Sequence, residues 1–541
     1  MNILLVTEKC GSSKNQRDGG ARLVETFKLA FGASLNIMQF GSESDSSARW
    51  HFKYPINLPN RFENRIANAD FIARKLKPVV QNFTHIIFVH ISMQFGITKL
   101  FLPKKISVWT FPMFLTPSYV ASGESVPKKY TELERLALAY SKRILTPSYL
   151  EKKQLIEFYL VPEEYIRVIP RGVVTKFLAP KTRYLNYSPR FCGVGSIKPQ
   201  KNTLGLIDLF AKINTEFLGS RLKIIGPVQD FEYFEKVLAK IDSLNLSKAV
   251  EFTGYVAPDN LATAIADMHV HLSTSNCETF GRSIFETLAS GLPNIAKATA
   301  NAAADFLKYS PYIRFADNDD VVLEILEEIL VNLPKLSSMA LEIGELYDDK
   351  MLSQLLVAEI CNRDSMAVSD FDGTLFHTNS PEKTQKCIES FRRFSTRIIC
   401  SARPLHDLLD SLKYYNLTVD WIISYSGALV TDGNGKLLWL TPINSEEISN
   451  LQQLVTNTKF IEFENNVLQI STPAESLPDI LGVRIEIYQG MAFIINWRAS
   501  KLRAVCKLLR YINWSGRVRV FGDGKYDNEI ITFFDGTLIA S

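Results

Sequence analysis

The chain has 541 residues, of which 46% are hydrophobic and 22% are charged, and its formal net charge at pH 7 is +4. This composition is typical of an ordinary globular protein, and the length predicts about three domains of roughly 150 residues each. So small a net charge provides no concentrated basic face, which excludes nucleic acid as an expected partner. No apolar stretch reaches the ~20 residues that span a bilayer, so we expect no transmembrane segment.

The seven cysteines are scattered along the chain, and the short apolar run ILLV near the start follows no basic segment. Scattered thiols without a CxxC pair are typical of a reducing compartment. The ILLV run reads as a first core strand and not as a signal peptide. We therefore expect a cytoplasmic location, and the sequence sets no expectation for the oligomeric state.

Two series of alternating strand-like and helix-like segments fill the first two thirds of the chain. The strand-like segments are NILLVT, HIIFVH, ISVWTF and RILTPS in the first series, and RFCGVGS, LKIIGP, AVEFTGYV and VHLSTS in the second. This alternation predicts parallel sheets covered by helices. We expect two tandem doubly wound, Rossmann-like domains at 1–182 and 183–362, with ligands beyond the carboxyl ends of their strands.

A third α/β unit begins at MAVSDFDG and resumes at VRVFGDG near the end of the chain. Between these segments lies DGNGKLLWL, whose Asp-Gly turn chemistry favours a hairpin. We expect a third domain at 363–541 with an inserted α+β cap at about 428–498.

The stretch SNCETFGRSIFETLASGLPNIA contains two glutamates, Glu278 and Glu286, eight residues apart. Gly281, which lies between the two glutamates, opens a predicted helix, and Gly291 closes that helix. The N-terminus of a helix offers amide groups and a positive dipole end, which suit a diphosphate. The alternative is that both glutamates are solvated residues flanking a helix.

The wider pattern over residues 1 to about 360 resembles the retaining GT-B glycosyltransferases of family four. The matching motifs are VIPRGV, VGSIKPQKN and ETFGRSIFE, together with the glycine pair that follows the first strand. The resemblance implies a nucleotide-sugar donor, no protein nucleophile and no obligatory metal in this half. One departure is Ser196, where many members carry an arginine, because serine lacks the two-pronged donor of a guanidinium.

The resemblance also implies roles for individual residues. Glu278 is expected to contact the donor sugar as a catalytic residue. The residues expected to bind the donor are Gly19, Gly20, His90, Lys201, Gly281 and Glu286. Within this set, Lys201 would neutralise the diphosphate and Glu286 would contact the ribose. For His90, which falls where many members carry a histidine near the sugar, an ordinary core histidine is the alternative.

Residues 367–377 read AVSDFDGTLFH and place Asp370 and Asp372 two apart behind an apolar run. Strand geometry would point both carboxylates toward one place. Three further motifs follow in order, namely RIICSAR with Ser401, RASKLRAVCKLL with Lys501, and GDGKYDNE with Asp523 and Asp527. The four motifs together resemble those of the haloacid-dehalogenase-like phosphatases.

By that resemblance, Asp370 is the nucleophile that forms an aspartyl-phosphate, and Asp372 is the general acid and base. Lys501 and Ser401 would bind the phosphate, and Arg403 would contact the phosphatase substrate. Mg²⁺, which prefers oxygen ligands, is expected at a site formed by Asp370, Asp372, Asp523 and Asp527.

The two halves together suggest a bifunctional enzyme. The first half would transfer a sugar to a phosphorylated sugar or polyol acceptor, and the second half would remove the phosphate. The order of the parts resembles that of plant sucrose-phosphate synthases, which is an analogy. One alternative is a glycan-building transferase fused to a phosphatase for an unrelated substrate. Another is that one half has a regulatory or scaffolding role without catalysis.

Overall fold

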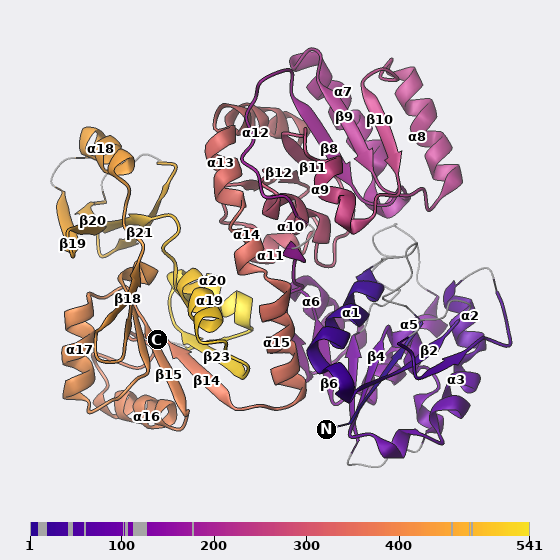
Figure 1. Cartoon of the computed structure of the whole chain (residues 1–541), viewed down its shortest axis with the longest axis horizontal. Helices are drawn as coiled ribbons and strands as arrows, with labels where there is room; N and C mark the ends of the chain where they lie inside the picture. Colours follow the sequence, from indigo (N-terminus) through magenta and orange to yellow (C-terminus); the bar gives the residue numbers. More distant parts are fainter. Residues whose placement is uncertain are drawn as a thin grey trace. The chain divides into compact units, whose positions relative to one another are not determined.

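The computed structural model describes residues 2–8, 19–41, 47–58, 61–100, 102, 106–111, 127–175, 178–455, 458–474, 477 and 480–539. The chain divides into two compact units, Met1–Ser353 and Gln354–Ser541 (Figure 1), and each is described by itself. Within these ranges, no helix combines the length and the apolar character needed to cross a membrane.

The first sheet of unit 1 has seven parallel strands in the order β3-β2-β1-β4-β5-β6-β7. The strands are β1 (Ile3–Thr7), β2 (Leu35–Phe40), β3 (Trp50–Phe52), β4 (His85–Val89), β5 (Ser107–Phe111), β6 (Arg143–Thr146) and β7 (Ile166–Val168). The helices of this part are α1 (Gly19–Phe31), α2 (Arg61–Ala67), α3 (Ala69–Leu76), α5 (Lys128–Ala139) and α6 (Tyr149–Tyr159). All residues of β1 and β5 are buried, as expected for parallel strands covered on both faces.

The second sheet has six parallel strands in the order β10-β9-β8-β11-β12-β13. The strands are β8 (Arg190–Val194), β9 (Arg221–Ile225), β10 (Val250–Gly254), β11 (Val270–Ser273), β12 (Asn294–Ala296) and β13 (Ile313–Phe315). The helices are α7 (Thr203–Glu216), α8 (Phe231–Ser243), α9 (Leu261–Ala264), α10 (Arg282–Ala289), α11 (Ala303–Leu307), α12 (Asp319–Val331), α13 (Leu333–Ala340), α14 (Ile343–Leu346) and α15 (Asp349–Ile360). The two predicted doubly wound folds are therefore confirmed.

The main sheet of unit 2 has seven strands in the order β18-β17-β16-β15-β14-β23-β24. The strands are β14 (Ser365–Ser369), β15 (Thr396–Cys400), β16 (Trp421–Ser424), β17 (Leu429–Asp432), β18 (Leu437–Leu440), β23 (Arg517–Gly522) and β24 (Thr537–Leu538). The helices are α16 (Pro381–Arg392), α17 (Leu405–Tyr414), α19 (Lys501–Tyr511) and α20 (Asn528–Phe534). Strands β17 and β18 are antiparallel additions at one edge of an otherwise parallel sheet.

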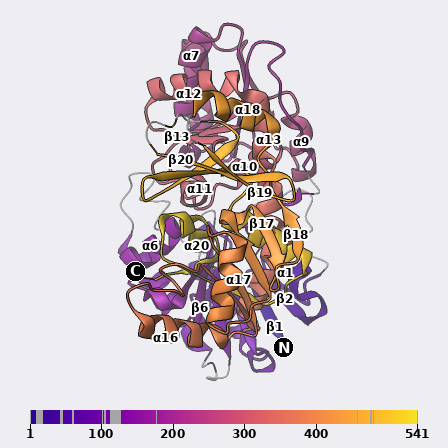
Figure 2. The ribbon, with the colours of Figure 1, turned by 90° about the vertical axis from the view of Figure 1, so that its left-hand side faces the viewer.

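A separate antiparallel sheet forms the cap, with the strand order β19-β20-β22-β21. Its elements are β19 (Lys459–Phe463), β20 (Asn466–Pro473), β21 (Val483–Tyr488), β22 (Met491–Asn496) and the helix α18 (Ser445–Leu454). Two views place α18 and the cap sheet at one end of unit 2 and α16 at the opposite end (Figure 1, Figure 2). The α+β cap is confirmed, but the predicted start at about 428 is too early. The hairpin 429–440 pairs with β16 and so extends the main sheet.

A fully buried histidine lies in the core of the second sheet. His271 belongs to β11, and its Nδ1 atom pairs with the side-chain oxygen of Asn294 on the neighbouring strand. Burial lowers the pKa of His271 to about 4, although Asn294 and Glu278 oppose this shift. The imidazole is therefore neutral in the folded protein at neutral pH.

This burial predicts an acid-sensitive fold for unit 1. The ordinary pKa of histidine is 6.5 and that of folded His271 is about 4. Between these values the unfolded chain binds a proton that the folded chain excludes, so the stability falls as the pH falls. The full loss is about 3 kcal/mol at pH values below both pKa values.

Unfolding free energies of the wild type and of His271→Gln, measured at neutral pH and near pH 4, check this prediction. The stability of the wild type relative to the variant should shrink on acidification, because glutamine does not titrate. A difference that is the same at both pH values would contradict the prediction.

Candidate active sites

Asp370 directly follows β14, next to the point where the strand order of the main sheet reverses. Its backbone N–H donates to the carbonyl of Phe521 on β23 (2.9 Å). The chain then turns at Gly373, which has a φ of +72°, and a Cβ there would lie 1.7 Å from a carboxylate oxygen of Asp523. Only glycine fits this position, so the turn brings the loops after β14 and β23 into contact.

Lys501, the first residue of α19, joins these loops. Its Nζ donates to Oδ1 of Asp370 (2.7 Å) and to Oδ1 of Asp527 (2.6 Å), and all three side chains are less than one tenth exposed. Burial would lower the pKa of Lys501, but the two carboxylates outweigh it and raise the pKa above its usual range. Burial also raises the pKa of Asp370 to about 6, against the pull of Lys501. Lys501 therefore remains charged between two carboxylates.

Asp523 completes a cluster of carboxylates beside this lysine. Oxygen atoms of Asp370, Asp523 and Asp527 lie within 4.8 Å of one another, an arrangement that could hold a metal ion. Oδ2 of Asp527 also accepts the backbone N–H groups of Asp523 (3.2 Å) and Gly524 (3.1 Å). A set of carboxylate oxygens at this spacing suits a hard divalent cation such as Mg²⁺.

Asp372 lies outside this cluster in the structure. Arg403 donates from Nε to Oδ2 (2.7 Å) and from Nη2 to Oδ1 (2.6 Å) of Asp372, a two-pronged contact. The guanidinium lies over the rings of Phe371 and Phe376. β14 ends at Ser369, so strand alternation does not extend to the two aspartates. Asp370 and Asp372 consequently have different partners, which the strand argument does not predict.

Ser401 follows β15, the strand beside β14. Its side chain is buried, and its Oγ accepts the backbone N–H of Arg403 (3.2 Å). Its backbone carbonyl accepts the N–H of Ser426, which follows β16 (3.0 Å). Ser401 thus lies at the same carboxyl edge of the sheet as Asp370.

A second lysine–carboxylate pair lies in unit 1, where the order of the second sheet reverses between β8 and β11. Lys201 ends the 3₁₀-helix η7 (Pro199–Lys201) and forms an ion pair with the buried Glu278. Burial would raise the pKa of Glu278, but Lys201 outweighs it and holds the pKa below its usual value. The backbone of Glu278 pairs with Ala300 and Ala302, which fixes its place in the loop. Glu278 is therefore an ionised hydrogen-bond acceptor at this edge.

The helix α10 begins immediately after Gly281, which has a φ of +82°. A Cβ at Gly281 would lie 3.2 Å from side-chain atoms of Ala303 and Ile284, so glycine suits both the backbone and the space. Glu286 lies on the second turn of α10 and is buried, as is Glu278. The alternative of two solvated glutamates is therefore wrong.

His90 directly follows β4 and has a φ of +92°, which is unusual for a residue other than glycine. Its Nδ1 accepts the backbone N–H of Ser92 (3.3 Å) and lies 2.8 Å from Oγ of the same residue. Because an amide can only donate, Nδ1 is the acceptor in the contact with the backbone of Ser92. The ring is half-buried, so His90 is not an ordinary core histidine.

A buried ion pair supports His90 through Ser92. Nη1 of Arg65 donates to Oγ of Ser92 (3.2 Å), and Nε of Arg65 donates to Oε2 of Glu8 (2.9 Å). Tyr54 donates its hydroxyl to the other oxygen of Glu8 (2.9 Å). Glu8 directly follows β1, so this cluster lies where the order of the first sheet reverses between β1 and β4.

Two protein families match the chain. Residues 180–320 match the family described as glycosyl transferases group 1, and residues 367–468 match haloacid dehalogenase-like hydrolases. The first range holds Lys201 and Glu278, and the second holds Asp370 and Arg403. The chain joins a domain of the glycosyl transferases group 1 to a haloacid dehalogenase-like hydrolase domain.

Two curated glycosyltransferases are similar to part of the chain. An alpha-monoglucosyldiacylglycerol synthase of Streptococcus pneumoniae is 24% identical over 298 residues, which are 49% of this chain and 66% of the relative. A D-inositol 3-phosphate glycosyltransferase of Acidothermus cellulolyticus is 28% identical over 177 residues, which are 29% of this chain and 39% of the relative. The chain thus spans less than two thirds of the length of each relative.

Solved structures share the fold of the glycosyltransferase part. Sucrose-phosphate synthase from Thermosynechococcus elongatus has a TM-score of 0.57 at 15% identity, over 67% of this chain and 98% of that chain. HepE from Anabaena, solved with UDP and glucose, has a TM-score of 0.55 at 13% identity, over 67% of this chain and 100% of that chain. At such low identity the likeness establishes a GT-B fold. Each match covers 67% of this chain, so about one third of this chain has no counterpart in either structure.

Among the residues predicted for the second catalytic site, Asp370, Lys501, Asp523 and Asp527 lie together in the structure. Asp372 does not join them and pairs with Arg403 instead. In the glycosyltransferase domain, the structure joins Lys201 to Glu278. Gly19 and Gly20 begin α1, and residues 9–18 before them lie outside the described part of the chain. The roles assigned to all these residues remain predictions.

No sequence motif predicts the cluster of Glu8, Arg65 and Ser92. Glu8 and Arg65 are 57 positions apart, so no local spacing links them. One signal was present, because Glu8 directly follows an apolar strand as Asp370 does.

We predict that Glu278→Gln lowers sugar transfer about 10²-fold or more, because glutamine removes a charged acceptor from the donor site. Hydrolysis of a generic phosphate ester by the same variant should remain near the wild-type rate, because Glu278 belongs to the other unit. Assays of nucleoside diphosphate release and of phosphate release on one preparation check this. Equal loss of both activities would indicate misfolding, and unchanged transfer would refute the assignment of Glu278.

Proposed function

We propose that the protein transfers a sugar from a nucleotide-sugar donor, with retention, to a phosphorylated sugar or polyol and then removes the phosphate by Mg²⁺-dependent hydrolysis. The observation that carries the proposal is the occurrence of two lysine–carboxylate sites in one chain, Lys201 with Glu278 and Lys501 with Asp370. The UDP and glucose bound to HepE support the donor class. The name of sucrose-phosphate synthase supports a product that carries phosphate.

In the transferase reaction, the bond between the sugar and the diphosphate breaks as the acceptor hydroxyl attacks from the same face. Lys201 and the N-terminal end of α10 at Gly281 would stabilise the developing charge on the diphosphate. Glu278 would accept hydrogen bonds from the sugar hydroxyls, and Glu286 would contact the ribose. The hydroxyl proton would pass to a phosphate oxygen of the departing diphosphate. The side chains thus supply position and charge.

In the phosphatase reaction, a carboxylate oxygen of Asp370 attacks phosphorus, and the bond from phosphorus to the leaving oxygen breaks. Asp372 would donate a proton to that oxygen and then take one from the water that hydrolyses the aspartyl-phosphate. Lys501 and Ser401 would hold the phosphoryl oxygens. Arg403 would exchange its contact with Asp372 for one with the substrate, which would free Asp372 to accept a proton.

The cluster of Asp370, Asp523 and Asp527 fits Mg²⁺, because it offers three closely spaced carboxylates of which Lys501 neutralises only part. A bound Mg²⁺ would screen the negative charge of the phosphate from the nucleophile.

We predict that Asp370→Asn accumulates a glycosylated product that still carries its phosphate. The substitution is nearly isosteric and removes the nucleophile together with its charge beside Lys501 and the acidic cluster, so phosphate release should fall by at least about 10³-fold. Donor turnover should continue. Mass spectrometry of the product and an assay of nucleoside diphosphate release measure the two effects.

The same experiment tests the uncoupled alternative. If the variant and the wild type form the same unphosphorylated product at the same rate, the two activities are not consecutive. A transferase for a glycan and a phosphatase for an unrelated substrate would then be the better description. If the wild type lacks one activity on every substrate tested, that half has a non-catalytic role.

We predict a different metal response for the two activities. EDTA should stop phosphate release and Mg²⁺ should restore it, because the described acidic cluster lies in the phosphatase domain. Sugar transfer should persist at least in part. Both rates are measured with EDTA and after readdition of Mg²⁺. Phosphate release at the full rate in EDTA would refute the metal assignment.

A further inference from the structure

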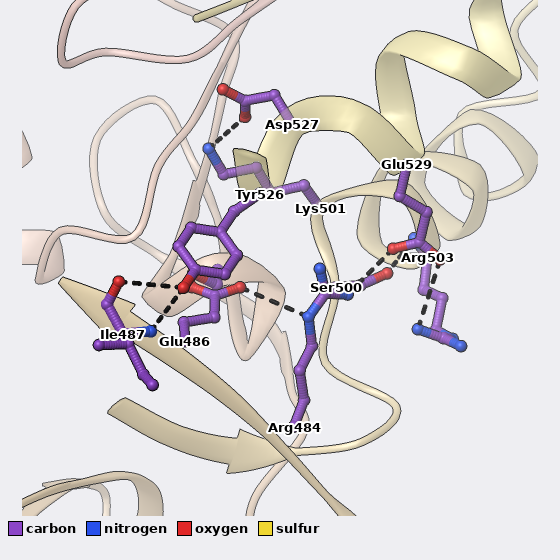
Figure 3. Close-up of polar contacts among 10 residues, drawn as sticks. Arg484, Glu486, Ile487, Ser500, Lys501, Arg503, Tyr526, Asp527 and Glu529 are labelled. Atoms are coloured by element: carbon purple, nitrogen blue, oxygen red, sulfur yellow. Dashed lines mark hydrogen bonds and ion pairs between the residues drawn. The ribbon is translucent and has the colours of Figure 1, made fainter. Parts of the chain in front are cut away.

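The cap strand β21 contacts the main domain at residues that are sequence neighbours of the predicted catalytic groups. Figure 3 shows these contacts around Arg484, Glu486 and Ile487 of the strand. Their partners include Tyr526, directly before Asp527, and the polar groups around Ser500, directly before Lys501. The cap is therefore bonded to the segments that carry the catalytic side chains.

Tyr526 makes the most direct connection. Its hydroxyl donates to the carbonyl of Ile487 (3.0 Å) and accepts the backbone N–H of the same residue (2.6 Å). Tyr526 belongs to the 3₁₀-helix η10 (Lys525–Asp527), whose last residue contacts Lys501. The backbone of β21 thus fixes the residue next to Asp527.

A partly buried charge network makes a second connection. Nη1 of Arg484 lies 3.0 Å from a carboxylate oxygen of Glu529 on α20, and Arg503 on α19 lies 3.8 Å from the other oxygen. Burial would raise the pKa of Glu529, but the two arginines and a hydrogen bond from Ser500 outweigh it and lower the pKa. Ser500 also caps α19 by accepting the N–H of Arg503 (3.1 Å). The network therefore holds the start of α19, where Lys501 lies.

A third connection reaches the loop after β16. Oγ of Ser426 donates to Glu486 of the cap strand. The next residue, Gly427, packs against Ser500 so closely that a Cβ would lie 2.4 Å from its carbonyl oxygen. The N–H of Ser426 donates to the carbonyl of Ser401. The strand thus contacts a third loop of the same site.

We propose that β21 is a positioning element of the phosphatase site, with Tyr526 and Arg484 as positioning residues for Asp527 and Lys501. The inference rests on the proposed function of these groups. If β21 only selected substrates, a substitution in it would change the binding of the part of the substrate that the strand touches. A strand that positions Asp527 and Lys501 affects the chemical step for every phosphate ester, including one too small to reach the cap.

The experiment uses the full chain and para-nitrophenyl phosphate with saturating Mg²⁺. We expect Tyr526→Phe to lower kcat about tenfold, because small displacements of catalytic groups are costly, while KM changes much less. Arg484→Met should lower kcat as well, and Arg484→Lys should restore part of it because the charge opposite Glu529 returns. Thermal unfolding should show that the variants are folded.

Tyr488→Phe is the matched control. Tyr488 ends the same strand, is 64% exposed, and its hydroxyl accepts a hydrogen bond from the neighbouring Gln489. Its kcat should equal that of the wild type. An unchanged kcat in folded Tyr526→Phe, or an equal loss in Tyr488→Phe, would overturn the inference. Failure of the proposed function would look different, because Asp370→Asn would then hydrolyse the ester as fast as the wild type.

Discussion

Each of the three largely parallel sheets reverses its strand order once, and charged or polar side chains gather beyond the carboxyl ends of the two strands that flank the reversal. Glu8 and His90 follow β1 and β4, Lys201 and Glu278 follow the ends of β8 and β11, and Asp370 and Asp523 follow β14 and β23. The connections diverge to opposite faces of the sheet at such a point, which leaves room for a ligand. Since most of these strands are buried on both faces, their ends are the places where polar groups can be presented.

The two lysine–carboxylate sites use one interaction for different chemistry. In unit 1, Lys201 pairs with Glu278, and the pKa of the glutamate lies below its usual value. In unit 2, Lys501 is shared by Asp370 and Asp527, and burial raises the pKa of Asp370 to about 6. A carboxylate with its own lysine is a stable acceptor for hydroxyl groups. A pair that shares one lysine retains negative charge, which is the condition for binding a divalent cation.

Buried charges of this kind are costly unless they are paired. The same reasoning applies to the buried pair of Arg65 with Glu8 and, less strongly, to the partly buried Glu529 between Arg484 and Arg503. Glu8 and Arg65 belong to no predicted motif, and Glu529 and Arg503 lie within the stretches GDGKYDNE and RASKLRAVCKLL without a predicted role. Holding a predicted site residue in place would give a physical reason for placing charges there.

The three α/β folds and many strand-end residues can be predicted from the sequence, because strand and helix periods and the residues at strand ends are local properties. Asp370 and Glu278 stand out from local pattern, whereas Lys201 and Lys501 were named because their motifs resemble those of known families. Only the tertiary structure decided which side chains meet, such as Asp372 with Arg403 and Tyr526 with Ile487. It also placed the hairpin 429–440 in the main sheet, because a local turn signal does not specify which strand the hairpin joins. Asp372 and Arg403 are 31 positions apart, and Ile487 and Tyr526 are 39 positions apart. Contacts between residues so far apart in the chain leave no periodic pattern in the sequence.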